Sequence, residues 1–187
     1  LMSSAKPYPA VISGTGLYTP ENVITNEELV ASYNSWADQY NAEHSEEIET
    51  GELEAKPQSS VEFIVKASGI QQRFAYVKEG ILDTGRMRPL IPERPEEALS
   101  DQAEMALYAA RDAIKAAGKS PADIDAVVVS CAYTQRAYPA IAIEVQNELG
   151  VKGFSFDMLV ACSAATFALH RGYEMVTAGT ARCVLLI

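Results

Sequence analysis

The sequence is poor in the residues that build disulfide frameworks and metal sites. Its 187 residues include three cysteines, Cys131, Cys162 and Cys183, and two histidines, His44 and His170. An odd number of cysteines without the spacing of metal ligands argues against a disulfide framework and against a zinc site. The sequence therefore predicts no disulfide framework and no metal site.

The sequence also lacks a long apolar run and a surplus of positive charge. No stretch approaches the roughly 18 consecutive apolar residues that a membrane-spanning helix requires. Residues 1–9 lack the basic region and apolar run of a secretion signal, so we expect a cytoplasmic protein without membrane contact. A net charge of −10 argues against nucleic acid as a partner, because phosphate groups demand a basic surface.

Two stretches in the first half of the chain have the pattern of capped helices. Thr25 and Glu28 have the spacing of a capping box and open an acidic helix that we expect to end at Gly51. The acidic residues of this helix are typical of a solvated face. Ser59 with Glu62 repeats the capping-box spacing before a second, shorter helix.

Five stretches are predicted to be strands: residues 10–17, 71–77, 126–131, 153–158 and 182–187. Helical patterns lie between several of them. Ser100 is placed to cap one such helix, and Pro139 and Gly150 mark the start and end of another. Strands interleaved with helices predict a layered α/β domain, and the length fits one domain.

Residues 154–179 carry the clearest candidate for chemistry. An alternating, strand-like run begins at Phe154, and a helix that Gly179 can stop follows it, so Cys162 falls at the junction. Backbone N–H groups at a helix start stabilise a thiolate over a thiol, which makes Cys162 a candidate nucleophile. The alternative is a small buried hydrophobe, the commonest state of free cysteine.

The helix after Cys162 is apolar on nearly all sides. Ala164, Ala168 and Gly172 give it one face of small residues, while Phe167 and Leu169 cover others. A helix that is apolar all round is typical of a buried position. We therefore expect a buried helix whose N-terminus points at the thiol.

Four segments, in order along the chain, resemble one known family. The segment Asp157-Met-Leu-Val-Ala-Cys162-Ser-Ala-Ala-Thr-Phe-Ala-Leu169 resembles the active-site segment of the β-ketoacyl-[acyl-carrier-protein] synthases III, members of the thiolase superfamily. The other three are Ile12-Ser-Gly-Thr-Gly-Leu-Tyr-Thr-Pro20 with Thr25-Asn26, Phe63-Ile-Val-Lys-Ala-Ser-Gly-Ile70 with Arg73, and Ala137-Tyr-Pro139 with Val145-Gln146 and Leu149-Gly150. This resemblance favours Cys162 as the nucleophile.

The resemblance implies a particular fold. It implies a thiolase-like layered α/β fold, with a five-stranded mixed sheet in the order 3-2-1-4-5 and helices on both faces. The whole chain, residues 1–187, would then be the N-terminal half of this duplicated fold, with a helical and loop insertion at about residues 26–98. That insertion is expected to be a lid, a partner surface or a simple covering. The family's catalytic histidine and asparagine come from a second half that these 187 residues do not contain.

The resemblance also implies substrate-binding residues. The aromatic residue at Tyr138 reaches across a twofold interface in the family and closes the partner's acyl pocket; the alternative is a ring packed in its own core. Phe63 stands where short-chain members carry a tryptophan that stacks on adenine, and Ala67 where they carry an arginine. These differences imply that coenzyme A is held differently, although Phe63 can still stack. For Ser68 and Arg73, substrate contact and a local structural role both stay open.

The function that the resemblance implies is a decarboxylative Claisen condensation. Cys162 would take an acyl group from acyl-coenzyme A, and malonyl-acyl-carrier protein would then receive it, in a homodimer serving fatty-acid or related ketide synthesis.

His170 lies eight residues beyond Cys162, roughly 12 Å along a helix and too far to act as its base. The chain alone is therefore expected to be inactive in condensation. The alternatives are a non-catalytic interaction module and, more distantly, a cysteine peptidase, for which no histidine lies within reach.

Overall fold

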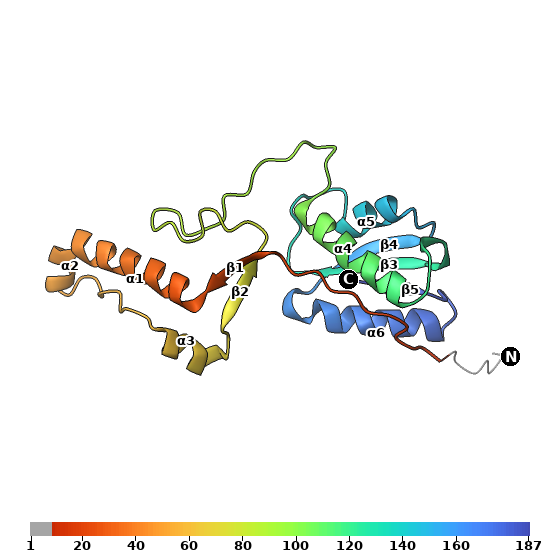
Figure 1. Ribbon diagram of the computed structural model, residues 1–187, viewed down its shortest axis with the longest axis horizontal. Coiled ribbons are helices and arrows are strands. Elements are labelled where there is room, and N and C mark those ends of the chain that lie inside the picture. The colour runs from red at the N-terminus through yellow and green to blue at the C-terminus, as the bar shows by residue number, and fades with distance from the viewer. Residues whose placement is uncertain (1–8) are drawn as a thin grey trace. The chain divides into compact units, whose positions relative to one another are not determined.

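The computed structural model describes residues 9–187, which divide into two units (Figure 1). The first unit contains residues 9–18 and Arg94–Ile187, and the second contains Thr19–Glu93. Each unit is described by itself. Residues 1–8, which bear on the expectation that a secretion signal is lacking, lie outside the described residues.

A parallel three-stranded sheet forms the centre of the first unit. Its order is β4 (Phe154–Leu159), β3 (Ala126–Cys131) and β5 (Val184–Leu186), and β3 pairs in parallel with both neighbours. The central strand has the sequence Ala-Val-Val-Val-Ser-Cys, and its first four residues are buried. A continuous apolar run of this kind is typical of a strand covered on both faces, as the sequence predicts.

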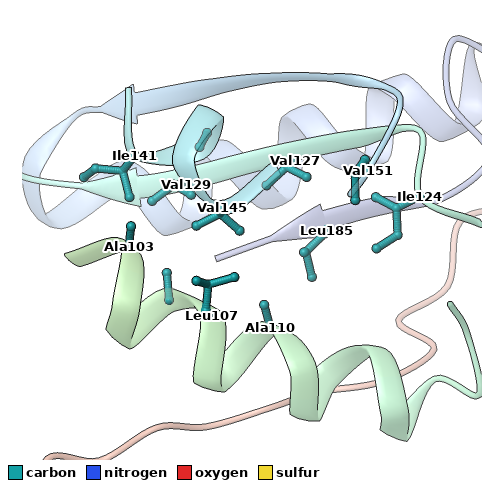
Figure 2. Close-up of a cluster of buried hydrophobic side chains, with 12 residues drawn as sticks. Ala103, Leu107, Ala110, Ile124, Val127, Val129, Ile141, Val145, Val151 and Leu185 are labelled. Atoms are coloured by element: carbon teal, nitrogen blue, oxygen red, sulfur yellow. The ribbon is translucent and has the colours of Figure 1, made fainter. Parts of the chain in front are cut away.

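Helices cover both faces of this sheet (Figure 1). On one face, Val127 and Val129 pack with α4 (Asp101–Ala116) and α5 (Ile141–Leu149) in one buried cluster, whose side chains Figure 2 shows. On the other face, Ala126 and Val128 pack with α6 (Ala164–Thr177). Alternate residues of β3 thus serve two cores, and each fully buried Val contributes about 1.5–3 kcal/mol to folding.

The expected strand at residues 10–17 and the expected strand order are wrong for this sheet. Residues 9–20 form no strand, and β3, not the N-terminal run, lies at the centre between β4 and β5. The N-terminal run instead lies on α4: a Cβ added to Gly16 would stand 2.1 Å from the carbonyl oxygen of Ala109. The side chains of Val11, Ile12 and Leu17 are about 80% exposed (81%, 77% and 79%). Backbone contact with α4, which only glycine allows, replaces strand pairing here.

The helix after the candidate nucleophile is covered on one side only. Ala164, Ala168, Gly172 and Met175 face the sheet and are buried. Phe167, Leu169 and Tyr173 are more than half exposed, at 51%, 54% and 56%. The expectation of a fully buried helix is therefore wrong within this chain, because no described residue covers its outer face.

The second unit combines a two-stranded antiparallel ribbon with three helices. The ribbon pairs β1 (Asn22–Thr25) with β2 (Gln72–Ala75), so the strand expected at residues 71–77 exists but belongs to this ribbon. The helices are α1 (Asn26–Glu43), α2 (Ser45–Glu49) and α3 (Val61–Ser68). The predicted single helix from Thr25 toward Gly51 is thus interrupted at His44, which ends α1 and precedes α2.

The predicted capping boxes locate these helices well. Thr25 and Glu28 form the predicted capping box of α1, and Lys78 donates a 2.6 Å hydrogen bond to Glu28 Oε1. This bond, with the backbone N–H of Thr25 second, lowers the pKa of the Glu28 carboxyl. For α3 the cap is Ser60 and not Ser59, because the Ser60 hydroxyl accepts the hydrogen bond from Phe63 N.

Among residues 9–187, none of the helices combines the length and apolar character needed to cross a bilayer.

Gly153 provides a test of how closely β4 approaches β3. A Cβ at this position would lie 1.8 Å from the carbonyl oxygen of Asp125, so Gly153→Ala forces two backbone segments apart. We expect the free energy of unfolding to fall by about 3 kcal/mol, at the upper end of the usual over-packing range. Urea denaturation measures this, and Gly85→Ala is the control because its Cβ would meet its nearest neighbour at 3.4 Å. Equal stability of the two variants would contradict the close approach.

Candidate active site

Cys162 lies where the chain turns from strand to helix in the first unit. β4 ends at Leu159, a single 3-10 turn spans Ala161–Ser163, and α6 begins at Ala164. The cysteine side chain is exposed. No side chain caps the start of α6, so its first N–H groups are free of a side-chain competitor in the described part of the chain. The thiol therefore sits before an uncapped helix start and within reach of solvent.

The residue immediately before Cys162 has an unusual backbone. Ala161 has φ of 45°, in the left-handed region that alanine rarely adopts. Such a conformation costs on the order of 1–3 kcal/mol and persists only where its surroundings enforce it. Residues of this kind cluster at active sites, where the strain fixes a neighbouring group. A strained residue thus stands directly before Cys162, in the turn between β4 and α6.

The other two cysteines differ from Cys162 in burial. Cys131 ends β3 and Cys183 precedes β5, and both are partly buried. Burial raises the pKa of the Cys131 thiol, and the charge of Asp157 raises it further. Burial is also the main cause of the raised pKa of the Cys183 thiol. Both thiols thus favour the protonated form, and both pack against the buried cluster around β3.

Tyr138 lies on a loop that the side chains of Gln135 and Arg136 anchor, whereas its own ring is exposed. Gln135 exchanges two hydrogen bonds with Asp101: the Asp101 N–H donates to Oε1 at 2.7 Å, and Gln135 Nε2 donates to Oδ2 at 3.1 Å. Arg136 donates to the carbonyl oxygen of Ala98 at 3.0 Å. The Tyr138 side chain remains 86% exposed. The ring is thus presented to solvent and is not packed in the core of its own unit.

The remaining candidates, Phe63, Ser68 and Arg73, belong to the second unit. Phe63 projects from α3 and is 65% exposed. Ser68 Oγ donates to the carbonyl oxygen of Ile64 at 2.8 Å and accepts from Ile70 N. Arg73 Nη1 donates to the buried Asn26 Oδ1 at 2.9 Å. Ser68 and Arg73 therefore make local hydrogen bonds, whereas the Phe63 ring is exposed.

The contacts of the two histidines are with residues other than Cys162. His170 is on α6, with Nε2 3.4 Å from Glu174 Oε1, and His44 is at the α1–α2 break, next to Tyr40. The described residues contain no group of three or more His, Cys, Asp or Glu side chains arranged to hold a metal ion. The site is thus built around one thiol and backbone groups.

A surface depression of about 440 Å³ lies between the C-terminal parts of α4 and α5, and its lining includes Arg111, Lys115, Lys119 and Glu148. It contains none of the candidate residues. α5 ends where β4 is about to begin, so the depression lies toward the opposite end of β4 from Cys162.

Comparison with known proteins gives close sequence relatives. No model of a protein family matches the chain. The chain is 52% identical over 156 residues to a β-ketodecanoyl-[acyl-carrier-protein] synthase of Pseudomonas aeruginosa strain PAO1, covering 83% of the chain and 45% of that protein. It is 32% identical over 187 residues to a β-ketoacyl-[acyl-carrier-protein] synthase III of Bordetella petrii, covering 100% of the chain and again 45% of the relative. The chain therefore spans less than half the length of these relatives.

The fold comparison agrees. The crystal structure of 3-oxoacyl-[acyl-carrier-protein] synthase III from Aquifex aeolicus VF5 matches with a TM-score of 0.63 at 26% identity, over 94% of this chain and 42% of that one. The chain thus has a thiolase-like α/β fold. By sequence it is a homologue of the β-ketoacyl-[acyl-carrier-protein] synthases III, and the coverage is consistent with the N-terminal half of such an enzyme.

Sequence reasoning missed two residues that shape this site. Nothing in the sequence marks Ala161 as left-handed, since glycine or asparagine is the usual signal. Asp157, on β4, accepts hydrogen bonds from the first N–H groups of α5. A signal did exist for it: Ala140, the residue before α5, has no side chain able to cap a helix, so a cap from elsewhere was required.

Alkylation tests the contrast between the three thiols. We expect iodoacetamide, titrated from pH 5 to 9, to modify Cys162 first, because it is exposed while burial raises the pKa of Cys131 and Cys183. A raised pKa leaves less thiolate at each pH, so these two should react only toward the alkaline end or after unfolding. Peptide mass mapping gives the order, and Cys162→Ala is the control. Simultaneous modification of all three thiols would contradict the assignment.

Proposed function

We propose that this chain carries the nucleophile of a β-ketoacyl-acyl-carrier-protein synthase III-like acyltransferase. The supporting observation is the placement of Cys162, exposed after β4, preceded by the strained Ala161 and followed by the uncapped start of α6. The 52% identical relative named as a β-ketodecanoyl synthase supports the same chemistry.

In the first half-reaction the Cys162 thiolate attacks the carbonyl carbon of an acyl-coenzyme A thioester. A new carbon–sulfur bond forms, and negative charge develops on the carbonyl oxygen. Backbone N–H groups at the turn, including that of Cys162, are suited to hold this oxyanion. When the intermediate collapses, the bond to coenzyme A sulfur breaks and coenzyme A leaves as the thiol after taking a proton. The product is acyl-Cys162.

In the second half-reaction malonyl-acyl-carrier protein loses carbon dioxide, and the electron pair of the broken carbon–carbon bond becomes an enolate. The enolate carbon attacks the acyl-Cys162 carbonyl, the carbon–sulfur bond breaks, and a β-ketoacyl-carrier protein departs. A histidine and an asparagine are expected to stabilise the enolate from the second half of the fold. The chain alone is proposed to reach acyl-Cys162 and not to complete condensation.

The proposed acyl donor is of medium length. A β-ketodecanoyl product has ten carbons, and malonyl contributes two after decarboxylation, so its acyl donor is octanoyl. We extend this preference from the Pseudomonas relative to the present chain. Coenzyme A is a substrate in this scheme and not a resident cofactor, and the exposed Phe63 ring is available to stack on its adenine.

Acylation of Cys162 is the direct test. We expect incubation of the intact protein with octanoyl-coenzyme A to add one octanoyl mass, located on the Cys162 peptide, because only this thiol is exposed among the described cysteines. Cys162→Ala should abolish the adduct. An adduct that persists in this variant, or a wild-type protein that takes up no acyl group, would refute the proposal.

A homodimer is proposed for the complete enzyme. β4 is an edge strand of the sheet within residues 9–187, and its Phe154 and Leu159 are 43% and 55% exposed. The open face of α6 adds Phe167 and Tyr173. An unpaired edge beside exposed apolar side chains is a template for pairing with another chain. In such a dimer the exposed Tyr138 is proposed to close the acyl pocket of the partner subunit.

Mixed dimers test both the assembly and the role of Tyr138. In a Tyr138→Ala homodimer we expect the rate ratio for octanoyl- over acetyl-coenzyme A to change by about tenfold, the effect of losing roughly one aromatic wall. In a mixed dimer of one Tyr138→Ala subunit and one Cys162→Ala subunit, the first subunit keeps Cys162 and the second keeps Tyr138. The remaining Cys162 is therefore served by an intact Tyr138 of the partner subunit. Its ratio should return to the wild-type value, measured by acyl-adduct mass. A ratio like that of the Tyr138→Ala homodimer would place Tyr138 at its own subunit's pocket.

A second candidate is a non-catalytic partner subunit that uses the same exposed apolar surface. The open α6 face and the β4 edge favour it, since both fit a docking role without any chemistry. The unit Thr19–Glu93 is proposed to correspond to the insertion expected at about residues 26–98 and to serve as a lid or a partner surface.

A further inference from the structure

The start of α5 is capped by a residue from another element. Its own N-cap, Ala140, makes no side-chain hydrogen bond. Asp157 on β4 supplies the cap instead: the N–H of Ile141 donates to Oδ2 at 2.9 Å, and the N–H of Ala142 donates to Oδ1 at 2.8 Å. Both carboxylate oxygens therefore bind the first turn of α5, and the negative charge faces the positive end of the helix.

A second polar contact fixes the other end of the same helix to the same strand. Ser155, two residues before Asp157 on β4, hydrogen-bonds through its hydroxyl to Gln146 Oε1. Gln146 Nε2 donates to the carbonyl oxygen of Gly153 at 2.7 Å. Because alternate strand residues share a face, Ser155 and Asp157 both face α5. The helix is thus held along β4 by polar groups at both ends.

Asp157 joins the two segments that carry the proposed site. It precedes Cys162 by five residues and lies on the strand that leads into the thiol-bearing turn. The N–H groups that it binds begin three residues after Tyr138. The contacts of Gln135 and Arg136 described above attach the Tyr138 loop to the segment around the start of α4, not to β4. The Asp157 carboxylate therefore ties the Tyr138 end of α5 directly to the Cys162 strand.

We infer that Asp157 is a positioning residue that sets the placement of Tyr138 relative to Cys162, and thereby the acyl-length preference. The inference rests on the proposed function. The role is one of positioning and not of catalysis, because each of the two oxygens binds a backbone N–H group of α5. Its effect passes through the start of α5 on one side and through β4 on the other.

The test is Asp157→Asn in the intact protein. The amide retains one acceptor, but its NH₂ group then faces a backbone N–H, so one of the two bonds is replaced by a donor–donor contact. We expect the octanoyl-to-acetyl rate ratio for acylation of Cys162 to change by about tenfold, since a shift of a positioning group on the order of 1 Å has effects of this size or larger. Alkylation of Cys162 by iodoacetamide, which needs no acyl pocket, should stay within about twofold of wild type.

A double variant separates positioning from simple helix capping. Ala140→Asp combined with Asp157→Asn gives α5 a cap from its own N-cap residue, whose extended backbone (φ −62°, ψ 148°) suits a capping side chain. Thermal stability should return toward wild type, while the altered rate ratio should persist because the tie to β4 is still missing. Recovery of both quantities would show that Asp157 is only a helix cap and would overturn the inference.

Ser155→Ala is the matched control on the same face of β4. It removes the contact at the far end of α5 and should lower stability without changing the octanoyl-to-acetyl ratio. A change equal to that of Asp157→Asn would also overturn the inference. The two levels of failure are distinct. A wild-type Cys162 that no thioester acylates refutes the proposed function, whereas an acylated wild type with an unchanged ratio in Asp157→Asn refutes the inference alone.

Discussion

The burial of β3 on both faces is the constraint on which the first unit depends. Ala126, Val127 and Val128 are fully buried, and Val129 is nearly so, with alternate residues facing two different layers of helices. Because the alternate side chains of β3 must pack in two different clusters, β3 has one stable register relative to its neighbouring strands. Because β4 and β5 run parallel to it, their carboxyl ends share one edge of the sheet, where parallel α/β sheets place their ligands. Cys162 follows β4 at that edge.

Local signals in the sequence were reliable where the physics is local. The Thr25–Glu28 capping box, the Ser100 cap of α4 and the left-handed Gly150 after α5 all occur as predicted. Each depends on groups within four residues of one another, so the sequence carries the whole interaction. The error of one residue between Ser59 and Ser60 has the same origin, since adjacent serines have equal capping ability and only the backbone decides.

Predictions that needed distant partners fared less well. The run at residues 10–17 was predicted to be a strand, yet Gly14 and Gly16 allow its backbone to lie directly on α4, and strand pairing is absent there. The strand order implied by the resemblance placed that run at the centre of the sheet, where β3 lies instead. The location of Cys162 at a strand-to-helix junction was predictable from apolar periodicity. The cap that Asp157 provides for α5 could not be predicted, because it joins residues on different elements. Its one indication in the sequence was the N-cap residue Ala140, whose side chain cannot accept a hydrogen bond.

The left-handed backbone at Ala161 has a consequence for how this chain can vary. Glycine adopts that geometry freely, asparagine and alanine less readily, and valine or isoleucine hardly at all. At apolar positions in the two cores the preference is nearly the reverse, because valine and isoleucine are favoured there over asparagine and glycine. At position 161, next to the sulfur, a saturation library would therefore select variants by the torsion of the main chain and not by hydrophobicity.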